Sequence, residues 1–134
     1  ALVGLPEPNG AGNDGRFLNH RFQAGARSYV GHTGSPMDYP AKALKAGDHG
    51  VPGGENMLVM GDGKVRYFTV REAARIQTFP DGYVFHGCWS ETMWQLGNAV
   101  PVRLAHIVAA SVAEKLARQD EIELKRTAKR LARG

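Results

Sequence analysis

Glycine and proline are concentrated in the first half of this chain, and this asymmetry limits what that half can form. Residues 1–63 hold 13 of the 17 glycines and five of the seven prolines. Glycine loses much backbone entropy in a helix, and proline interrupts the helical hydrogen bonds. We therefore expect a loop-rich region with short strands rather than long helices.

One antiparallel β-hairpin is expected within this region. Two strand-like runs, 57–60 and 64–68, are joined by Gly61, Asp62 and Gly63. These residue types supply the positive φ angles that a tight turn needs, so the pattern favours a hairpin.

The second half has the patterns of helices. Thr69 and Glu72 form a capping-box sequence, which predicts a short helix from Val70 to about Thr78 that ends before Pro80. A second short helix is expected from Glu91 to Leu96.

Ser90 is the expected N-cap of that second helix, and Gly97 and Asn98 are expected to end it in the left-handed conformation. A third helix is expected to begin near Pro101. Its apolar positions, at four-residue spacing, form one packing face: Leu104, Val108, Val112 and Leu116. Beyond Ala117 the apolar pattern thins among charged residues.

Composition restricts the class of protein. The chain has 134 residues, 43% of them apolar, and one cysteine, so it can bury a core, and disulfide-stapled, collagen-like and wholly disordered classes are excluded. The first eight residues have no signal-peptide pattern and no apolar run reaches 18 residues. We expect a cytoplasmic protein with no membrane partner.

The net charge of +4 comes mainly from the end of the chain. Residues 114–133 hold seven Lys or Arg against four Asp or Glu, and the remainder is nearly neutral. Such a tail is more often a solvated helix end than a binding site, so both interpretations stay open.

The residues indicate neither a catalytic nucleophile nor a metal site. Cys88 is close to His86 in sequence, a spacing that rarely aims two side chains at each other. The five histidines are at least twelve residues apart and have no cysteine partners, so no zinc spacing occurs. The glycine-rich segment instead carries dispersed side chains that suit phosphate groups, and these are the candidate DNA-binding residues: His32, Lys42, Lys45 and His49.

Two segments carry a resemblance to a known family. They read Arg-Tyr-Phe-Thr-Val-Arg-Glu-Ala-Ala-Arg-Ile-Gln-Thr-Phe-Pro over 66–80 and Gln-Leu-Gly-Asn-Ala-Val-Pro over 95–101. In this order and at this separation they resemble the last two conserved blocks of DNA cytosine-5 methyltransferases. Residues 40–42 and 49–56 are similar to the end of a bacterial target-recognition region of the same family. The resemblance extends to about Glu114.

The resemblance implies an activity and a limit on it. Such enzymes attack C6 of a flipped-out cytosine with a cysteine thiolate and transfer a methyl group from S-adenosylmethionine to C5. The family's Pro-Cys, Glu-Asn-Val and Phe-x-Gly-x-Gly motifs do not occur here. The chain therefore resembles the carboxyl-terminal part of the enzyme, with no catalytic residue of its own. Its implied partners are duplex DNA and an amino-terminal catalytic half, on the same polypeptide or on a separate subunit.

The implied fold is α+β in three regions. These are a partial recognition region over 1–66, a helical block over 67–100, and a helix with a basic tail over 101–134. In the family the last helix packs on a Rossmann-like sheet that this chain does not contain. We therefore predict that the isolated chain self-associates through its apolar stripe or is held by a partner.

The resemblance also assigns site residues. Asn98, Ala99 and Val100 match the segment that approaches S-adenosylmethionine, although a helix C-cap alone would also explain them. The residues that match mainly structural positions are Thr69, Arg71, Glu72, Arg75, Gln95 and Gly97.

Two positions depart from the family pattern. Ala43 precedes Leu44 where relatives carry a Thr-Leu pair whose hydroxyl meets a phosphate, and Trp94 replaces Arg or Lys. Two functions therefore stay open: part of an active methyltransferase, and a non-catalytic DNA-binding module derived from one.

Overall fold

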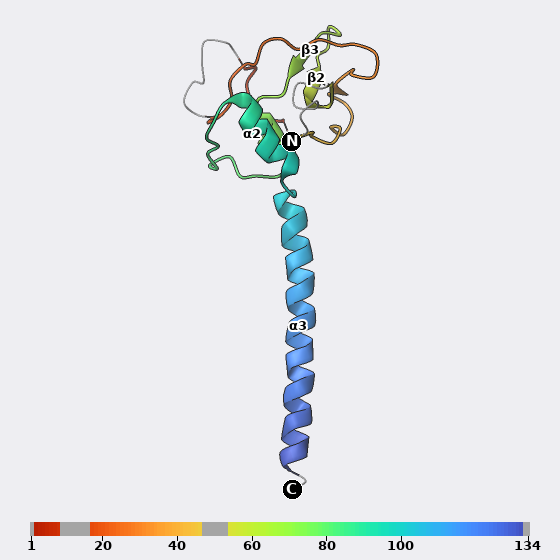
Figure 1. Cartoon of the computed structure of the whole chain (residues 1–134), viewed down its shortest axis with the longest axis vertical. Helices are drawn as coiled ribbons and strands as arrows, with labels where there is room; N and C mark the ends of the chain where they lie inside the picture. Colours follow the sequence, from red (N-terminus) through yellow and green to blue (C-terminus); the bar gives the residue numbers. More distant parts are fainter. Residues whose placement is uncertain (1, 9–16, 47–53, 133–134) are drawn as a thin grey trace. The chain divides into compact units, whose positions relative to one another are not determined.

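The computed structural model describes residues 2–8, 17–46 and 54–132, in two compact units, Ala1–Pro101 and Val102–Gly134. The first unit combines a small sheet with two helices, and the second is a single helix (Figure 1). The predicted α+β class is therefore present. The division of the chain after residue 66 stays a prediction.

The predicted hairpin is confirmed. Strands β2 (Met57–Val59) and β3 (Val65–Tyr67) pair antiparallel. The N–H of Met60 donates to the carbonyl of Lys64 at 2.8 Å, and Gly63 takes a φ of +79° in the turn.

A third strand, β1 (Ser35–Pro36), was not predicted from sequence. It pairs parallel to β2, so the sheet order is β1-β2-β3. Gly34 precedes it with a φ of +78°, and a Cβ there would lie 3.1 Å from the Val59 side chain. A strand of two residues has no alternating pattern that sequence reasoning could detect. A 3-10 turn, η1 (Gly54–Asn56), leads into β2.

Helix α1 (Val70–Ile76) begins at the predicted capping box. The Glu72 N–H donates to the Thr69 hydroxyl at 3.1 Å, and the Thr69 N–H donates to the Glu72 carboxylate at 2.8 Å. The helix ends two residues earlier than predicted, because Thr78 adopts a φ of +59°.

Helix α2 (Trp89–Asn98) corrects the prediction at both ends. Its N-cap is Cys88, not Ser90, because the Cys88 N–H finds the Glu91 carboxylate at 3.0 Å. It ends at Asn98 through an extended Ala99 with a φ of −75°, not through a left-handed residue.

The core of the first unit lies where the two helices meet the sheet. Its buried side chains come from β2, α1, α2 and the segments beside them: Leu44, Leu58, Phe68, Val70, Ala73, Ala74, Phe85, Met93 and Leu96. This core fixes the two short helices, and α2 carries the candidate cofactor residue Asn98 at its end.

Helix α3 (Val102–Leu131) continues through the predicted tail. Ion pairs at i,i+4 spacing stabilise its charged half, Glu114 with Arg118 and Glu121 with Lys125. Within residues 102–131, none of the side chains is buried.

By length and composition alone, the described stretch Trp89–Leu131 is apolar enough to cross a membrane, with a mean hydropathy of 1.3 in its best window. A single such stretch is weak evidence for a membrane span, because core helices of soluble proteins meet the same criteria.

Candidate nucleic-acid interface

Three of the four predicted DNA-binding side chains lie close together. His32 Nδ1 is 3.8 Å from one carboxylate oxygen of Glu55, and Lys45 Nζ is 3.3 Å from the other. Lys42 Nζ donates to the hydroxyl of Thr33, the residue after His32, at 3.2 Å. The fourth, His49, lies outside the described residues.

Glu55 was missed in the sequence and changes the electrostatics of this cluster. Its own backbone N–H, and then the Lys45 ammonium, hold the pKa of Glu55 below its ordinary value. The carboxylate is therefore charged at neutral pH and offsets part of the Lys45 charge. Lys42 contacts a neutral hydroxyl rather than a carboxylate.

A tight turn beside this cluster was also missed. The His32 N–H donates to the Tyr29 carbonyl at 2.8 Å, and the Tyr29 N–H donates back at 3.3 Å. The two rings lie 4.4 Å apart, and Gly31 takes a φ of +83°. The turn presents Val30, which is 99% exposed.

Asn56 fixes the backbone that carries Lys45. It is fully buried, its side-chain oxygen accepts the Lys45 N–H, and its side-chain amide donates to the Lys45 carbonyl, both at 3.1 Å. A carboxamide that satisfies both main-chain groups of one residue acts as a rigid support. Sequence reasoning missed it because its partner is eleven residues away.

Gly97 brings the end of α2 against the same segment. A Cβ at position 97 would lie 2.7 Å from the backbone nitrogen of Ala46 and 2.8 Å from the carbonyl carbon of Lys45. A side chain there would displace backbone, so glycine is required for this approach. The crossing places the candidate cofactor segment beside the candidate DNA-binding segment.

The candidate cofactor residues lie at the exposed end of α2. Asn98 and Val100 are exposed, and Ala99 is half-buried. Asn98 and Gln95 share a shallow hollow of about 440 Å³ with Glu91 and Trp94.

Gln77 connects the ends of the two short helices. Its side-chain amide donates to the carbonyl of Leu96 at 2.8 Å and to that of Ala99 at 3.3 Å. This support for the residues before Pro101 was not predicted from sequence.

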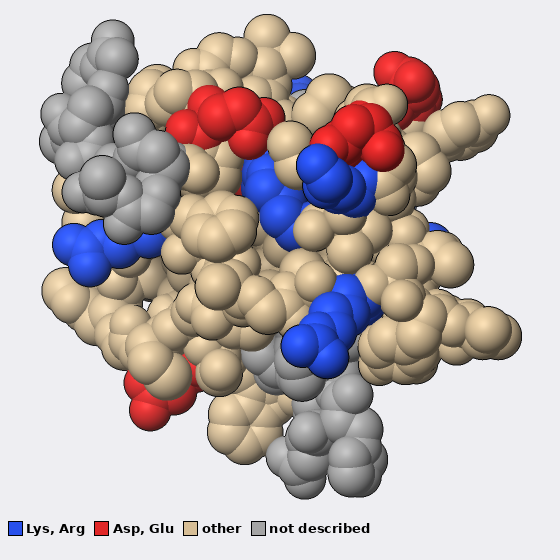
Figure 2. Space-filling view, turned by 90° about the horizontal axis from the view of Figure 1, so that it is seen from above, with Lys and Arg blue, Asp and Glu red and all other residues tan. Residues whose placement is uncertain are grey.

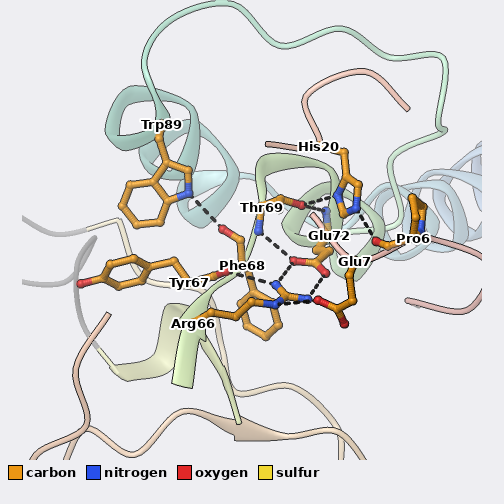
Figure 3. Close-up of polar contacts among 9 residues, drawn as sticks. All are labelled: Pro6, Glu7, His20, Arg66, Tyr67, Phe68, Thr69, Glu72 and Trp89. Atoms are coloured by element: carbon orange, nitrogen blue, oxygen red, sulfur yellow. Dashed lines mark hydrogen bonds and ion pairs between the residues drawn. The ribbon is translucent and has the colours of Figure 1, made fainter. Parts of the chain in front are cut away.

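Two of the residues expected to be structural, Thr69 and Glu72, lie in a largely buried polar network at the start of α1 (Figure 3). Both terminal nitrogens of Arg66 donate to the Glu72 carboxylate at 2.8 Å, and Glu7 lies 3.4 Å from Arg66 Nε. The ring of His20 lies between the Thr69 hydroxyl at 2.8 Å and the Pro6 carbonyl at 2.7 Å. These contacts hold the first residues of the chain on α1.

Arg75 forms a second ion pair at the other end of α1. Its guanidinium contacts both carboxylate oxygens of Asp81, at 2.7 and 2.6 Å. Hydrogen bonding to Arg75 lowers the pKa of Asp81. The pair fixes the turn after Pro80.

The described residues give no sign of a metal centre: none of their His, Cys, Asp and Glu side chains form a group of three or more. Cys88 is exposed at the start of α2.

Comparison with known proteins defines the class of this molecule as that of the DNA methylases. Residues 12–114 match the family model for C-5 cytosine-specific DNA methylases. The chain belongs to the C-5 cytosine-specific DNA methylase family.

Individual relatives are Type II methyltransferases. The chain is 55% identical over 53 residues to M.Eco47II of Escherichia coli, covering 40% of this chain and 13% of the relative. It is 40% identical over 77 residues to M.AplI of Arthrospira platensis, covering 57% and 22%. It therefore spans less than a quarter of the length of these two curated relatives.

Proposed function

We propose that this chain forms the DNA-recognition region and one wall of the S-adenosylmethionine pocket of a DNA cytosine-5 methyltransferase. The nucleophilic cysteine resides in a part of the enzyme that this sequence does not include. The family membership supports the reaction class. The sequence lacks the family's Pro-Cys, Glu-Asn-Val and Phe-x-Gly-x-Gly motifs, and this supports placing the catalytic residues in another part of the enzyme.

The close crossing at Gly97 carries this proposal. It brings the end of α2, with Asn98, against the backbone of Lys45 and Ala46 and the Cβ of Ala46. A methyltransferase must hold a methyl donor and a target base within reach of each other. A fixed contact between the two binding segments supplies one part of that geometry.

Each segment has a defined task in this proposal. The Lys42 ammonium binds a DNA phosphate, and Lys45 contributes once its contact with Glu55 is exchanged for a phosphate. The carboxamide of Asn98 offers both a donor and an acceptor, which fits the ammonium and carboxylate of an amino-acid moiety. S-adenosylmethionine supplies the methyl group, and Gln77 holds the backbone of Leu96 and Ala99 in place for it.

Reconstitution tests the proposal. The chain is mixed with a separately produced catalytic portion that contains the Pro-Cys motif, and transfer of a labelled methyl group to duplex DNA is measured. We expect transfer from the mixture and none from the chain alone. A folded, stoichiometric complex that transfers no methyl group contradicts the proposal.

Two variants separate the roles within that assay. Asn98→Ala is expected to raise the KM for S-adenosylmethionine about tenfold and to leave the KM for DNA unchanged, because one hydrogen-bonded polar contact is lost. Lys42→Gln is expected to raise the KM for DNA and to leave the KM for S-adenosylmethionine unchanged. If either variant changed the KM for DNA and the KM for S-adenosylmethionine by the same factor, the separate roles of Asn98 and Lys42 would be contradicted.

One observation favours a second candidate, a DNA-binding module without transfer chemistry. Ala43 is exposed where relatives present a phosphate-binding hydroxyl. This candidate requires that the chain alone bind duplex DNA with an affinity that falls steeply with salt. It is supported if the chain binds DNA and the reconstituted complex stays inert, and it is excluded if low-salt gel shifts detect no binding.

A further inference from the structure

Helix α3 extends beyond the part of the chain that matches the family. The family match ends at residue 114, and the helix continues to Leu131. Four cations occupy its last turns, Lys125, Arg126, Lys129 and Arg130, and no Asp or Glu occurs from 125 to 132. The family relationship does not account for this charge segregation.

The helical geometry places these four cations on one side. At about 100° per residue they fall within an arc of roughly 140°, along about 8 Å of helix axis. All four are exposed, and Lys125 also contacts Glu121. We name these four residues the basic face.

Four Lys and Arg residues of the first unit form ion pairs with acids. Arg66 pairs with Glu72, Arg75 with Asp81, Lys64 with Asp62 and Lys45 with Glu55. Figure 2 shows Lys and Arg dispersed over the drawn face, several beside Asp or Glu, rather than in one continuous patch. The basic face is a denser and less compensated concentration of positive charge than this surface.

We propose that the basic face binds the phosphate backbone of DNA in a sequence-independent manner and adds to the affinity of the recognition segment. This inference rests on the proposed function in one respect, namely that the substrate is DNA. Lys and Arg supply the donors that phosphates accept, and a helix spaces them regularly.

The composition of α3 favours DNA over a lipid surface. Helices that lie in a membrane interface present Trp, Phe and Leu opposite their cations. Residues 102–132 contain no Trp, Tyr or Phe, and near the basic face only Leu124 and Leu131 lie on the opposite side, with Ile122 on the same side as the cations.

The test compares two variants of the full chain that each remove two positive charges from α3. Lys129→Gln with Arg130→Gln alters the basic face, and Lys115→Gln with Arg118→Gln is the matched control. Glutamine is a good helix former, so circular dichroism should show unchanged helix content. Binding to a target duplex and to a scrambled duplex is measured by fluorescence anisotropy between 50 and 200 mM salt.

We expect the basic-face variant to lower the slope of log K against log salt by about 2, since each phosphate contact contributes about 0.9. Both duplexes should lose the same factor in affinity, and the control should keep the original slope. An unchanged slope in the basic-face variant overturns the inference and leaves the proposed function intact. Absence of any binding by the unaltered chain at 50 mM salt also overturns the inference and excludes the DNA-binding module, whereas the methyltransferase proposal is decided separately by the reconstitution assay.

A third arm measures binding to vesicles of 30% phosphatidylserine in phosphatidylcholine. Vesicle binding that depends on Lys129 and Arg130, together with DNA binding that does not, would assign the basic face to lipid and overturn the inference.

Discussion

Arg71 is fully buried, and its guanidinium donates to main-chain carbonyls. It contacts Leu18, Pro80 and Tyr83 at 2.9, 3.1 and 2.6 Å. Burial lowers the pKa of Arg71, although the charge of Asp81 opposes this shift. The sequence motif predicted a mainly structural role, but it could not name these partners, because Leu18 is 53 positions away.

Loss of the buried charge at Glu72 should destabilise the chain strongly. Glu72→Gln removes the buried countercharge of Arg66, leaves only the exposed Glu7 beside it and weakens the cap of α1, so we expect a decrease of about 2–4 kcal/mol in the free energy of unfolding. The control is Glu114→Gln, which breaks an exposed pair with Arg118 and should cost under about 0.5 kcal/mol. Urea denaturation measures both, and equal effects would contradict this account.

Restoring a hydroxyl at position 43 should strengthen DNA binding. Ala43 is exposed, so Ala43→Thr introduces a donor for a phosphate oxygen without altering the core. A net hydrogen bond of about 1 kcal/mol corresponds to a roughly fivefold lower Kd. Ala43→Val has nearly the same shape without the hydroxyl, and a comparable gain in this control would refute the explanation.

At the scale of elements, the features predicted correctly from sequence are those that depend on residues adjacent in the chain. The capping box at Thr69 and the turn at Gly63 depend on a few adjacent positions, and both are present. The N-cap of α2 was predicted wrongly because Ser90 has the stronger intrinsic preference, whereas the position of Glu91 favours Cys88. The parallel strand β1 exists through pairing with residues more than twenty positions away.

The contact between α2 and the segment at Lys45 should be sensitive to one methyl group. Gly97→Ala places a Cβ within 2.8 Å of backbone atoms, so the two segments must move apart, at a cost of about 1–3 kcal/mol. Gly82→Ala is the matched control, because nothing lies within 4 Å of its Cβ. Thermal unfolding compares them. If Gly97→Ala and Gly82→Ala had the same stability, the contact between α2 and the segment at Lys45 would not be tightly packed.

At the scale of the whole molecule, the candidate site was predicted in its parts but not in its assembly. His32, Lys42, Lys45 and Asn98 were singled out by residue type and by resemblance. Their shared supports, Glu55, Asn56 and Gln77, were not, because a buried carboxamide or carboxylate has no local sequence signature. Contacts that close over long separations are set by the packing of the core, which spacing alone does not specify.

The exposed apolar stripe of α3 should determine the state of association. Leu104, Val108, Val112 and Leu116 are each at least 51% exposed. We expect the isolated chain to self-associate, and Leu104→Gln with Leu116→Gln to shift it toward monomer, because contiguous exposed apolar surface favours association.

The control for this prediction, Leu124→Gln with Leu131→Gln, removes two leucines outside the stripe and should leave association unchanged. Light scattering measures the molar mass. If the unaltered chain is a monomer at high concentration, the prediction is refuted. We further expect that adding the catalytic portion dissociates the self-associated form.

The close contact of Gly97 with Lys45 and Ala46 joins the segment proposed for DNA to the segment proposed for the methyl donor. If the proposed roles hold, we expect DNA binding at Lys45 to shift the backbone next to Asn98. By thermodynamic reciprocity, the methyl donor would then change the affinity for DNA by the same factor as DNA changes the affinity for the donor. On the proposed function, the missing side chain at Gly97 would thus couple DNA recognition to donor binding.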